Sequence, residues 1–200
     1  MGGKRLRLLV LTAATALLIG AAPAGARPSC GKARAGGQVL AKTREAVVWG
    51  RGPDVFGCHR SVGRARRMPI LWDGLNGFQL QGRYVAYAEL REEQMDEFYD
   101  VLHVYDLVAG RSKVRVLRSP ISSLVLKRNG SVGYIETNTN DPDTEDDPVS
   151  EVHAISNEDG LRDVTLDTGP RIDPKSLSLS PDRRTMSWTH GGETRSAPLR

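Results

Sequence analysis

One local pattern occurs four times along the 200-residue chain. It consists of a large aliphatic residue, a middle residue that is mostly small, and an aromatic residue. Its copies are Val47-Val48-Trp49, Val85-Ala86-Tyr87, Val132-Gly133-Tyr134 and Met186-Ser187-Trp188. In a β-strand the first and third positions share one face, and the middle position lies on the other. Each copy therefore predicts a strand with one bulky and one thin face, which suits sheets that stack about 10 Å apart.

The surroundings of the pattern repeat as well. An apolar residue of an earlier extended run lies seven to nine residues before each aromatic residue, at Leu40, Leu80, Leu126 and Leu179. Turn-forming pairs favour tight hairpins between the two runs, at Gln81-Gly82, Asn129-Gly130 and Pro181-Asp182. Third strands are predicted at 102–106 and 152–156, turning glycines at Gly63, Gly110 and Gly160, and fourth strands at 113–117 and 164–166. Four antiparallel strands that recur every 38 to 54 residues, measured between the aromatic residues, are typical of propeller blades.

Two of these segments resemble known propeller families. The run 177–188, with Ser180-Pro181-Asp182 at its centre, resembles the Ser-Pro-Asp-Gly blade motif of TolB-type propellers. The segment His103-Val104-Tyr105-Asp106 resembles the third strand of WD-repeat blades. Arg183 stands where the TolB-type motif usually has glycine, and Tyr105 stands where the WD-repeat strand has tryptophan. The resemblance implies a propeller fold, and these departures leave any shared ligand or partner undefined.

The predicted fold is therefore all-β, a small or incomplete β-propeller of about four blades of antiparallel strands. A two-sheet β-sandwich is the alternative. The last blade lacks an evident fourth strand after Leu199. An open arc would expose strand edges, which soluble proteins avoid. The segment 38–42 could supply a closing strand, or the chain could pair with another copy of itself.

The first residues carry the features of a cleavable secretory signal peptide. Lys4, Arg5 and Arg7 precede an apolar run from Leu8 to Ile19, and small residues follow at 24–26. We expect residues 1–26 to be removed and residues 27–200 to form a single all-β repeat domain, secreted by a bacterial export route. The apolar run is short for a membrane span, which needs roughly 20 residues, so a retained anchor is the weaker alternative. We expect no membrane span after cleavage.

The charge of the chain gives little support to nucleic-acid binding. The formal net charge is +4, and removal of Lys4, Arg5 and Arg7 with the leader lowers it to +1. Few aromatic residues lie among the basic segments 60–67 and 111–118, whereas single-stranded nucleic acid is held by interleaved aromatic and basic side chains. We expect these bases mostly to face solvent on outer strands, with an anionic cell-wall polymer as the alternative ligand.

The two cysteines, Cys30 and Cys58, are predicted to form a disulfide, because an exported chain reaches an oxidising compartment. Two buried thiols are the alternative.

Two acidic segments are the most suggestive functional feature. They fall between the second and third strands of successive blades, at 89–100 and 136–151, and equivalent loops emerge on one rim of a propeller. We therefore predict a partner-binding rim made of Glu92, Glu93, Asp96, Glu97, Asp141, Asp143, Glu145, Asp146 and Asp147. Calcium at Asp141, Asp143 and Glu145 is a weaker alternative, because the segment lacks the glycine of the helix-loop-helix calcium motif. No other metal or cofactor is predicted.

Histidine and catalytic motifs carry no positive prediction. His103 and His153 occupy matching positions in their blades, so a whole sheet spacing separates them and they cannot share one ion. No Gly-x-Ser-x-Gly, His-Glu-x-x-His or phosphate-binding glycine loop is present. We expect a secreted, non-catalytic binding protein with a protein or cell-envelope partner. The alternatives are a secreted hydrolase or lyase that acts on an extracellular polymer, a calcium-stabilised structural domain, and a remnant of a longer propeller.

Overall fold

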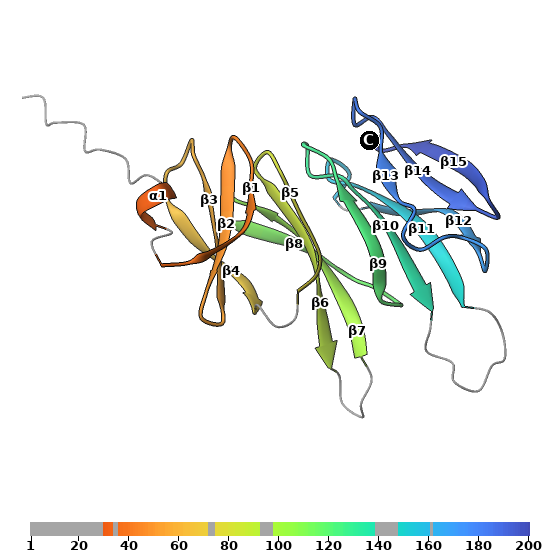
Figure 1. Cartoon of the computed structure of the whole chain (residues 1–200), viewed down its shortest axis with the longest axis horizontal. Helices are drawn as coiled ribbons and strands as arrows, with labels where there is room; N and C mark the ends of the chain where they lie inside the picture. The colour runs from red at the N-terminus through yellow and green to blue at the C-terminus, as the bar shows by residue number, and fades with distance from the viewer. Residues whose placement is uncertain (1–29, 34–35, 72–74, 93–97, 139–147, 161) are drawn as a thin grey trace, which may run out of the picture.

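The computed structural model describes residues 30–33, 36–71, 75–92, 98–138, 148–160 and 162–200. These residues form a short helix, α1 (Cys30–Ala33), and four antiparallel sheets, which we call blades 1 to 4 (Figure 1). Blade 1 contains β1 (Gln38–Lys42), β2 (Ala46–Arg51), β3 (Asp54–His59) and β4 (Ala65–Leu71). Blade 2 contains β5 (Leu75–Gln81), β6 (Tyr84–Glu92), β7 (Phe98–Asp106) and β8 (Arg111–Val116). Blade 3 contains β9 (Ile121–Leu126), β10 (Val132–Asn138), β11 (Val149–Ser156) and β12 (Arg162–Gly169), and blade 4 contains β13 (Ser178–Leu179), β14 (Thr185–His190) and β15 (Glu193–Pro198).

The blades stack in chain order into an open arc, an incomplete β-propeller, as the sequence predicts. In every blade the order of the strands follows their order in the sequence. Blades 1 and 4 lie at opposite ends of the longest axis in Figure 1. Four separate sheets exclude the two-sheet sandwich. The segment 38–42 is not a closing strand, because it forms β1 and pairs with β2 of its own blade.

The alternation of bulky and thin strand faces explains the stacking. Val85 and Tyr87 pack toward blade 1, while Ala86 and Ala88 pack toward blade 3. Blade 3 repeats this arrangement, since Tyr134 packs on blade 2 and residues on the other side of β10 meet blade 4. The aromatic residue of the pattern thus always lies on the side of the preceding blade, and the thin face receives the next blade.

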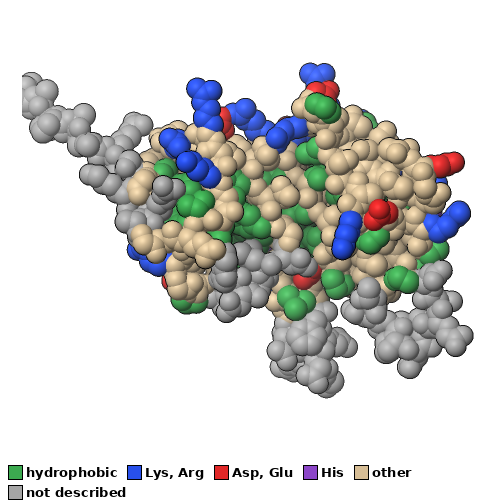
Figure 2. Space-filling view, viewed as in Figure 1, with side chains coloured by type: hydrophobic (Ala, Val, Ile, Leu, Met, Phe, Trp, Pro, Cys, Tyr) green, Lys and Arg blue, Asp and Glu red, His purple; other side chains and the backbone are tan. Residues whose placement is uncertain are grey.

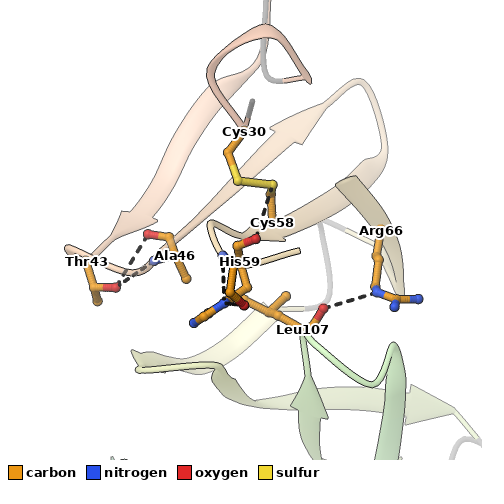
Figure 3. Close-up of a disulfide and its surroundings, with 8 residues drawn as sticks. Cys30, Thr43, Ala46, Cys58, His59, Arg66 and Leu107 are labelled. Carbon is orange, nitrogen blue, oxygen red and sulfur yellow. Dashed lines mark hydrogen bonds between the residues drawn. A yellow bond between two sulfur atoms is a disulfide. The ribbon is translucent and has the colours of Figure 1, made fainter. Parts of the chain in front are cut away.

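The faces of the two end blades that have no neighbouring blade are covered or polar. In blade 1, Val47 and Trp49 pack with the Cys30–Cys58 disulfide, whose sulfur atoms lie 2.05 Å apart and which anchors α1 to this face (Figure 3). The disulfide is the pairing expected from the sequence. In blade 4, Met186 and Trp188 pack on blade 3, and the opposite face carries Pro198 and the small polar side chains of Ser178, Thr185, Ser187, Thr189, Thr194 and Ser196. Terminal units of stacked repeats need such caps, because an uncovered apolar face would aggregate.

The antiparallel order gives the arc two faces. The turns between the first and second strands of each blade, and between the third and fourth, emerge on one side, the upper edge in Figure 1, which we call the turn face. The second strand of each blade ends and the third strand begins on the opposite side, which we call the loop face. Gly63, Gly110 and Gly160 lie in the turns before the fourth strands, with φ angles of 65°, 72° and 70°, a left-handed conformation that favours glycine. In the described residues no helix is long and apolar enough to span a bilayer.

Candidate functional site

A cavity of about 780 Å³ opens on the turn face, and we call it the turn-face pocket. Its lining residues belong to all four blades: Thr43, Arg44, Glu45, His59, Arg60, Ser61, Gln81, Gly82, Arg128 and Arg183. Because the first-to-second-strand turn of every blade contributes, the pocket exists only when the four blades are stacked. The sequence gives no signal for this site, since its residues are spread over 141 positions of the chain.

The pocket is rich in arginine. It contains Arg44, Arg60, Arg128 and Arg183, and all four side chains are solvent-exposed. Of these four arginines, only Arg128 forms an ion pair within the described part of the chain, with Glu45 across the pocket. Lys and Arg side chains project along the upper edge of Figure 2, where the turn face lies. Guanidinium groups suit carboxylate and phosphate groups, which they bind through two parallel hydrogen bonds.

Local hydrogen bonds fix the first turn of the pocket. The hydroxyl oxygen of Thr43 accepts hydrogen bonds from the backbone N–H groups of Glu45 (3.2 Å) and Ala46 (3.1 Å). The backbone N–H of Thr43 also donates to the carbonyl of Ala46 at 2.9 Å. Arg44 and Glu45 therefore stand at the tip of a rigid turn, which limits the entropy lost when they bind a ligand.

The fourth turn of the pocket places a cation at a position that favours glycine. Arg183 has a φ of 58°, and it is the only residue other than glycine with positive φ among the described residues. Asp182 holds this turn, because its Oδ1 accepts hydrogen bonds from the Ser180 hydroxyl (2.6 Å) and the Arg184 N–H (3.1 Å). A side chain in the left-handed region costs about 1–2 kcal/mol relative to ordinary backbone. The resembling TolB-type motif usually has glycine here, so the arginine adds charge at the expense of stability.

A serine and a histidine meet in the pocket. The hydroxyl of Ser61 lies 2.7 Å from Nδ1 of His59 and donates to it, because the same nitrogen accepts the Ser61 N–H at 3.3 Å. Burial, with a further contribution from Arg83, lowers the pKa of His59, and Asp106 only partly opposes this. No carboxylate of the described residues lies within ion-pair distance of the ring. The pair is a local turn contact that lacks the third group of a catalytic triad.

The predicted acidic rim lies almost entirely outside the described residues. This holds for Glu93, Asp96, Glu97, Asp141, Asp143, Glu145, Asp146 and Asp147, and thus also for the calcium candidates. Glu92 is the last residue of β6. The ends of β6 and β10 both point to the loop face, the lower edge in Figure 1.

The expected bounds of the two acidic loops were too wide. Glu89 and Asp100 lie in β6 and β7, and Glu136 and Glu151 lie in β10 and β11. The ladder between β6 and β7 continues to the pair Glu92↔Phe98, so Glu89 and Asp100 pair within the sheet and do not belong to the connecting segment. Of these four carboxylates, Asp100 and Glu136 are 1% and 5% exposed, which removes them from any solvated rim.

The two histidines that match between blades are buried against tyrosines. The rings of Tyr87 and His103 stack at 4.7 Å, and so do those of Tyr134 and His153. Nε2 of His103 lies 3.2 Å from Glu89, but burial is the dominant effect and lowers the pKa of this histidine. The aromatic residue and the histidine are direct cross-strand partners in both blades, so the stack follows from the register.

His153 has three carboxylate neighbours. Its Nε2 lies 3.3 Å from Oε1 of Glu136 and 3.2 Å from Oε2 of Glu151, and its Nδ1 lies 3.1 Å from Oδ1 of Asp163. Burial lowers the pKa of His153, but hydrogen bonds to Asp163 and Glu136 outweigh it and raise the pKa to about 9. The prediction that His103 and His153 cannot share an ion concerned ligands from two blades. The three carboxylates around His153 all belong to its own blade: Glu136 lies on β10, Glu151 lies on β11 two residues before His153, and Asp163 lies on β12.

The two basic segments also connect blades. Arg66 donates to the carbonyls of Leu107 (3.1 Å) and Val108 (2.8 Å) in blade 2 (Figure 3), and Lys113 donates to the carbonyl of Asn157 in blade 3 at 2.7 Å. Arg66 and Lys113 are therefore exceptions to the expectation that these bases mostly face solvent. The expectation describes the exposed side chains of the same segments, namely Arg60, Arg64, Arg67, Arg111 and Arg118.

Known proteins share the fold of this chain. The tricorn protease superposes with a TM-score of 0.53 and 14% identity over 75% of this chain. The β-propeller domain of the trilobed protease from Pyrococcus furiosus (TM-score 0.44, 15% identity, 62% of this chain) and Kluyveromyces lactis Hsv2 (0.48, 15%, 81%) were also found. The chain spans 14% of the length of the tricorn protease chain and 42% and 49% of the other two. No protein-family model and no curated protein sequence matches. The likeness establishes the propeller fold and nothing about activity.

Proposed function

We propose that this chain is an exported, non-catalytic interaction protein that receives an acidic group of a protein or cell-envelope partner in the turn-face pocket. The observation that carries this proposal is the convergence of four arginines from four different turns on one cavity of about 780 Å³. An interaction role suits the propeller fold, which presents many loops on a rigid stack. Export is the interpretation of residues 1–26, and the Cys30–Cys58 disulfide is compatible with it.

The charge balance of the pocket favours an anionic ligand. Glu45 compensates Arg128, and the described residues supply no carboxylate for Arg44, Arg60 or Arg183. These three cations therefore repel one another until an anion enters. The exposed positions of the guanidinium groups suit a partner that approaches from solvent, such as an acidic peptide or an anionic polymer.

The lack of an oriented nucleophile supports a non-catalytic role for the pocket. A serine becomes nucleophilic when a histidine accepts its proton and a third group orients that histidine. In the pocket Ser61 and His59 form a turn contact without such a group. A secreted hydrolase or lyase is the competing function, and it predicts that Ser61→Ala or His59→Ala abolishes turnover of a polymer substrate.

Titration of the purified chain with tripolyphosphate, a small polyanion, tests the proposal. The variant Arg44→Ala/Arg128→Ala/Arg183→Ala should lower the affinity at least tenfold, and calorimetry measures the change. The control variant Arg64→Ala/Arg162→Ala/Arg171→Ala removes three exposed arginines outside the pocket and has the same net charge. Equal affinity of both triple variants would show that binding follows net charge alone and would contradict the pocket.

The loops that follow β6 and β10 are a second candidate surface, because the strands that lead to them end on the same face. We propose that their acidic residues recruit a basic region of the partner. A variant in which Asp141, Asp143, Asp146 and Asp147 become asparagine should capture less partner from extracellular material than the parent chain does. Equal capture by the two would remove the acidic rim from the proposal and leave the turn-face pocket untouched.

A further inference from the structure

Blade 3 holds two carboxylates and one imidazole that face the same point. One ligand atom each of Glu136, Glu151 and His153 lies within 4.8 Å of the others. Glu136 and His153 are each 5% exposed, and Glu151 is half-buried. The three side chains line a cavity of about 170 Å³ between blades 2 and 3, which is separate from the turn-face pocket. We propose that these residues bind a divalent metal ion of the zinc type.

The spacing of the ligand atoms agrees with tetrahedral coordination. Zinc binds nitrogen and oxygen ligands at about 2.0–2.1 Å, and ligand atoms at two corners of such a tetrahedron are about 3.3 Å apart. Nε2 of His153 lies 3.3 Å from Glu136 and 3.2 Å from Glu151. Two edges of the tetrahedron thus already have the required length, and the third, between the two carboxylates, is at most 4.8 Å long.

One buried carboxylate oxygen of a residue that lines this cavity would be stabilised by a cation. Oε2 of Glu136 is shielded from solvent and has no hydrogen-bond partner among the described residues. A buried carboxylate oxygen without a hydrogen bond is destabilising, so such atoms are rare unless they have a ligand. A metal ion that Glu136 binds through both of its oxygens would satisfy Oε2.

A further carboxylate orients the imidazole as metal sites require. Asp163 accepts a hydrogen bond from Nδ1 of His153 at 3.1 Å, which directs Nε2 toward the two glutamates. Asp163 is itself held by the hydroxyl of Tyr134 at 2.8 Å and by Arg115 at 3.3 Å. Histidine ligands of metals almost always donate their other ring nitrogen to such a group, which fixes the tautomer and raises the basicity of the ligand.

The ligand set selects the class of ion. Calcium takes six to eight oxygen ligands, and magnesium prefers an octahedral shell of oxygen and water. One imidazole and two carboxylates fit zinc and other borderline divalent ions better. The protein supplies three ligands, and Arg115 and Arg118 also line the cavity. An anion from solvent, rather than a cation, would be the suitable fourth ligand there.

Blade 2 provides an internal control. Glu89 and His103 occupy the positions of Glu136 and His153, and their atoms also lie 3.2 Å apart. The residue opposite Glu89 is Val101, whereas Glu136 faces Glu151. Ser112 stands where blade 3 has Asp163, because each pairs with the residue two positions after the histidine. Blade 2 thus lacks one ligand and the orienting carboxylate, and we expect it not to bind metal.

Calorimetric titration of the chelator-treated full chain, without a histidine tag, with zinc chloride tests the site. The parent chain should bind one zinc ion per chain, and Glu136→Gln should abolish this binding. Asp163→Asn should weaken it about 10- to 100-fold, as loss of a partner of a metal-binding histidine does. The matched blade 2 variant Glu89→Gln should bind zinc as the parent does.

Two outcomes would overturn the proposal: no zinc binding by the parent chain, or equal binding by the parent and Glu136→Gln. Circular dichroism melting establishes that each variant is folded. If Glu136→Gln does not fold, the half-buried Glu151→Gln takes its place, and parent-like binding by that variant overturns the proposal equally. The turn-face pocket does not enter this experiment, so its result is independent of the proposed function.

Discussion

Met186 of blade 4 lies directly over Gly133 of blade 3, so that a Cβ atom at position 133 would be 2.8 Å from its sulfur and 3.1 Å from the side chain of Val125. Such a contact is too short for real Cβ atoms, and Met186 is completely buried. Gly133→Ala should therefore destabilise the protein by about 1 kcal/mol, the low end of the usual cost of an overpacked core, because the atoms that must shift form the flexible end of Met186. Urea unfolding measures the change in the free energy of unfolding.

A double mutant separates this contact from any intrinsic effect of alanine in the strand. Met186→Ala alone opens a cavity and should cost about 2–5 kcal/mol. In Gly133→Ala/Met186→Ala the new methyl group occupies part of that cavity, so the combined loss should be smaller than the sum of the two single losses. Strict additivity would mean that the two residues do not meet as the structure shows.

The contact between Gly133 and Met186 also shows why the fold could be read from the sequence. The middle position of the repeated pattern is small because a neighbouring blade packs on it, and the aromatic position is large because it fills the preceding interface. Both properties are local and have the period of a strand. The sequence could not say whether the arc closes, because that depends on caps. The outer face of blade 4 is mostly polar, and the disulfide holds α1 over the outer face of blade 1. Both caps can be recognised only when the strand face that each residue occupies is known.

The candidate sites were harder to predict, because each depends on register or stacking. Glu136 and Glu151 are cross-strand partners, and only the length of the β10–β11 ladder distinguishes them from loop residues. The matching Glu89 and His103 of blade 2 gave a usable signal, namely a glutamate two positions after the aromatic residue in both blades. The turn-face pocket gave no such signal, since Arg44 and Arg183 come to line the same pocket only when the four blades are stacked.

The Cys30–Cys58 disulfide should stabilise blade 1 in particular. It joins residues 28 positions apart and holds α1 over Trp49, which is 1% exposed. Replacing both cysteines with serine should lower the free energy of unfolding by about 3 kcal/mol, from the loop-closure entropy that the disulfide removes from the unfolded chain. Urea unfolding of the two chains without reductant measures this difference.

Hydrogen exchange shows where the stability is lost. Without the disulfide, amides of β2 should exchange faster under native conditions, because α1 no longer covers Val47 and Trp49. Amides of β14, at the other end of the arc, serve as the control and should change less. Equal acceleration in β2 and β14 would show that the disulfide acts on the whole arc and not as a cap of blade 1.

Asp167 connects blades 3 and 4 and should make their junction sensitive to acid. It accepts hydrogen bonds from Trp188 (2.7 Å), His190 (3.0 Å) and Arg195 (2.8 Å). Burial raises the pKa of this carboxyl group, but the three hydrogen bonds outweigh burial and leave the pKa below the ordinary value of 3.8. Asp167→Asn should cost about 2 kcal/mol near neutral pH, the scale of a hydrogen bond to a charged group.

The pH dependence of this loss has a definite sign. The pKa of Asp167 is lower in the folded than in the unfolded chain, so its stabilising effect is complete above the unfolded value of 3.8. The effect disappears as the pH falls through the lowered pKa of the folded state. The difference in unfolding free energy between the parent and Asp167→Asn should thus be fully present at pH 5 and shrink as the pH falls below 3.8. A difference that grows as the pH falls below 3.8 would contradict the role assigned to Asp167.

Arg183 should show opposite effects on stability and on anion binding. Its φ of 58° is unfavourable for any residue with a Cβ atom, so Arg183→Gly should stabilise the chain by about 1 kcal/mol. The same change removes one cation of the turn-face pocket and should weaken tripolyphosphate binding. Arg183→Ala is the matched control, because it removes the charge but keeps the strained conformation. It should weaken binding equally and bring no gain in stability. If glycine instead leaves the affinity at the parent value, Arg183 lines the cavity without contacting its ligand, and the anion site must rest on Arg44, Arg60 and Arg128 alone.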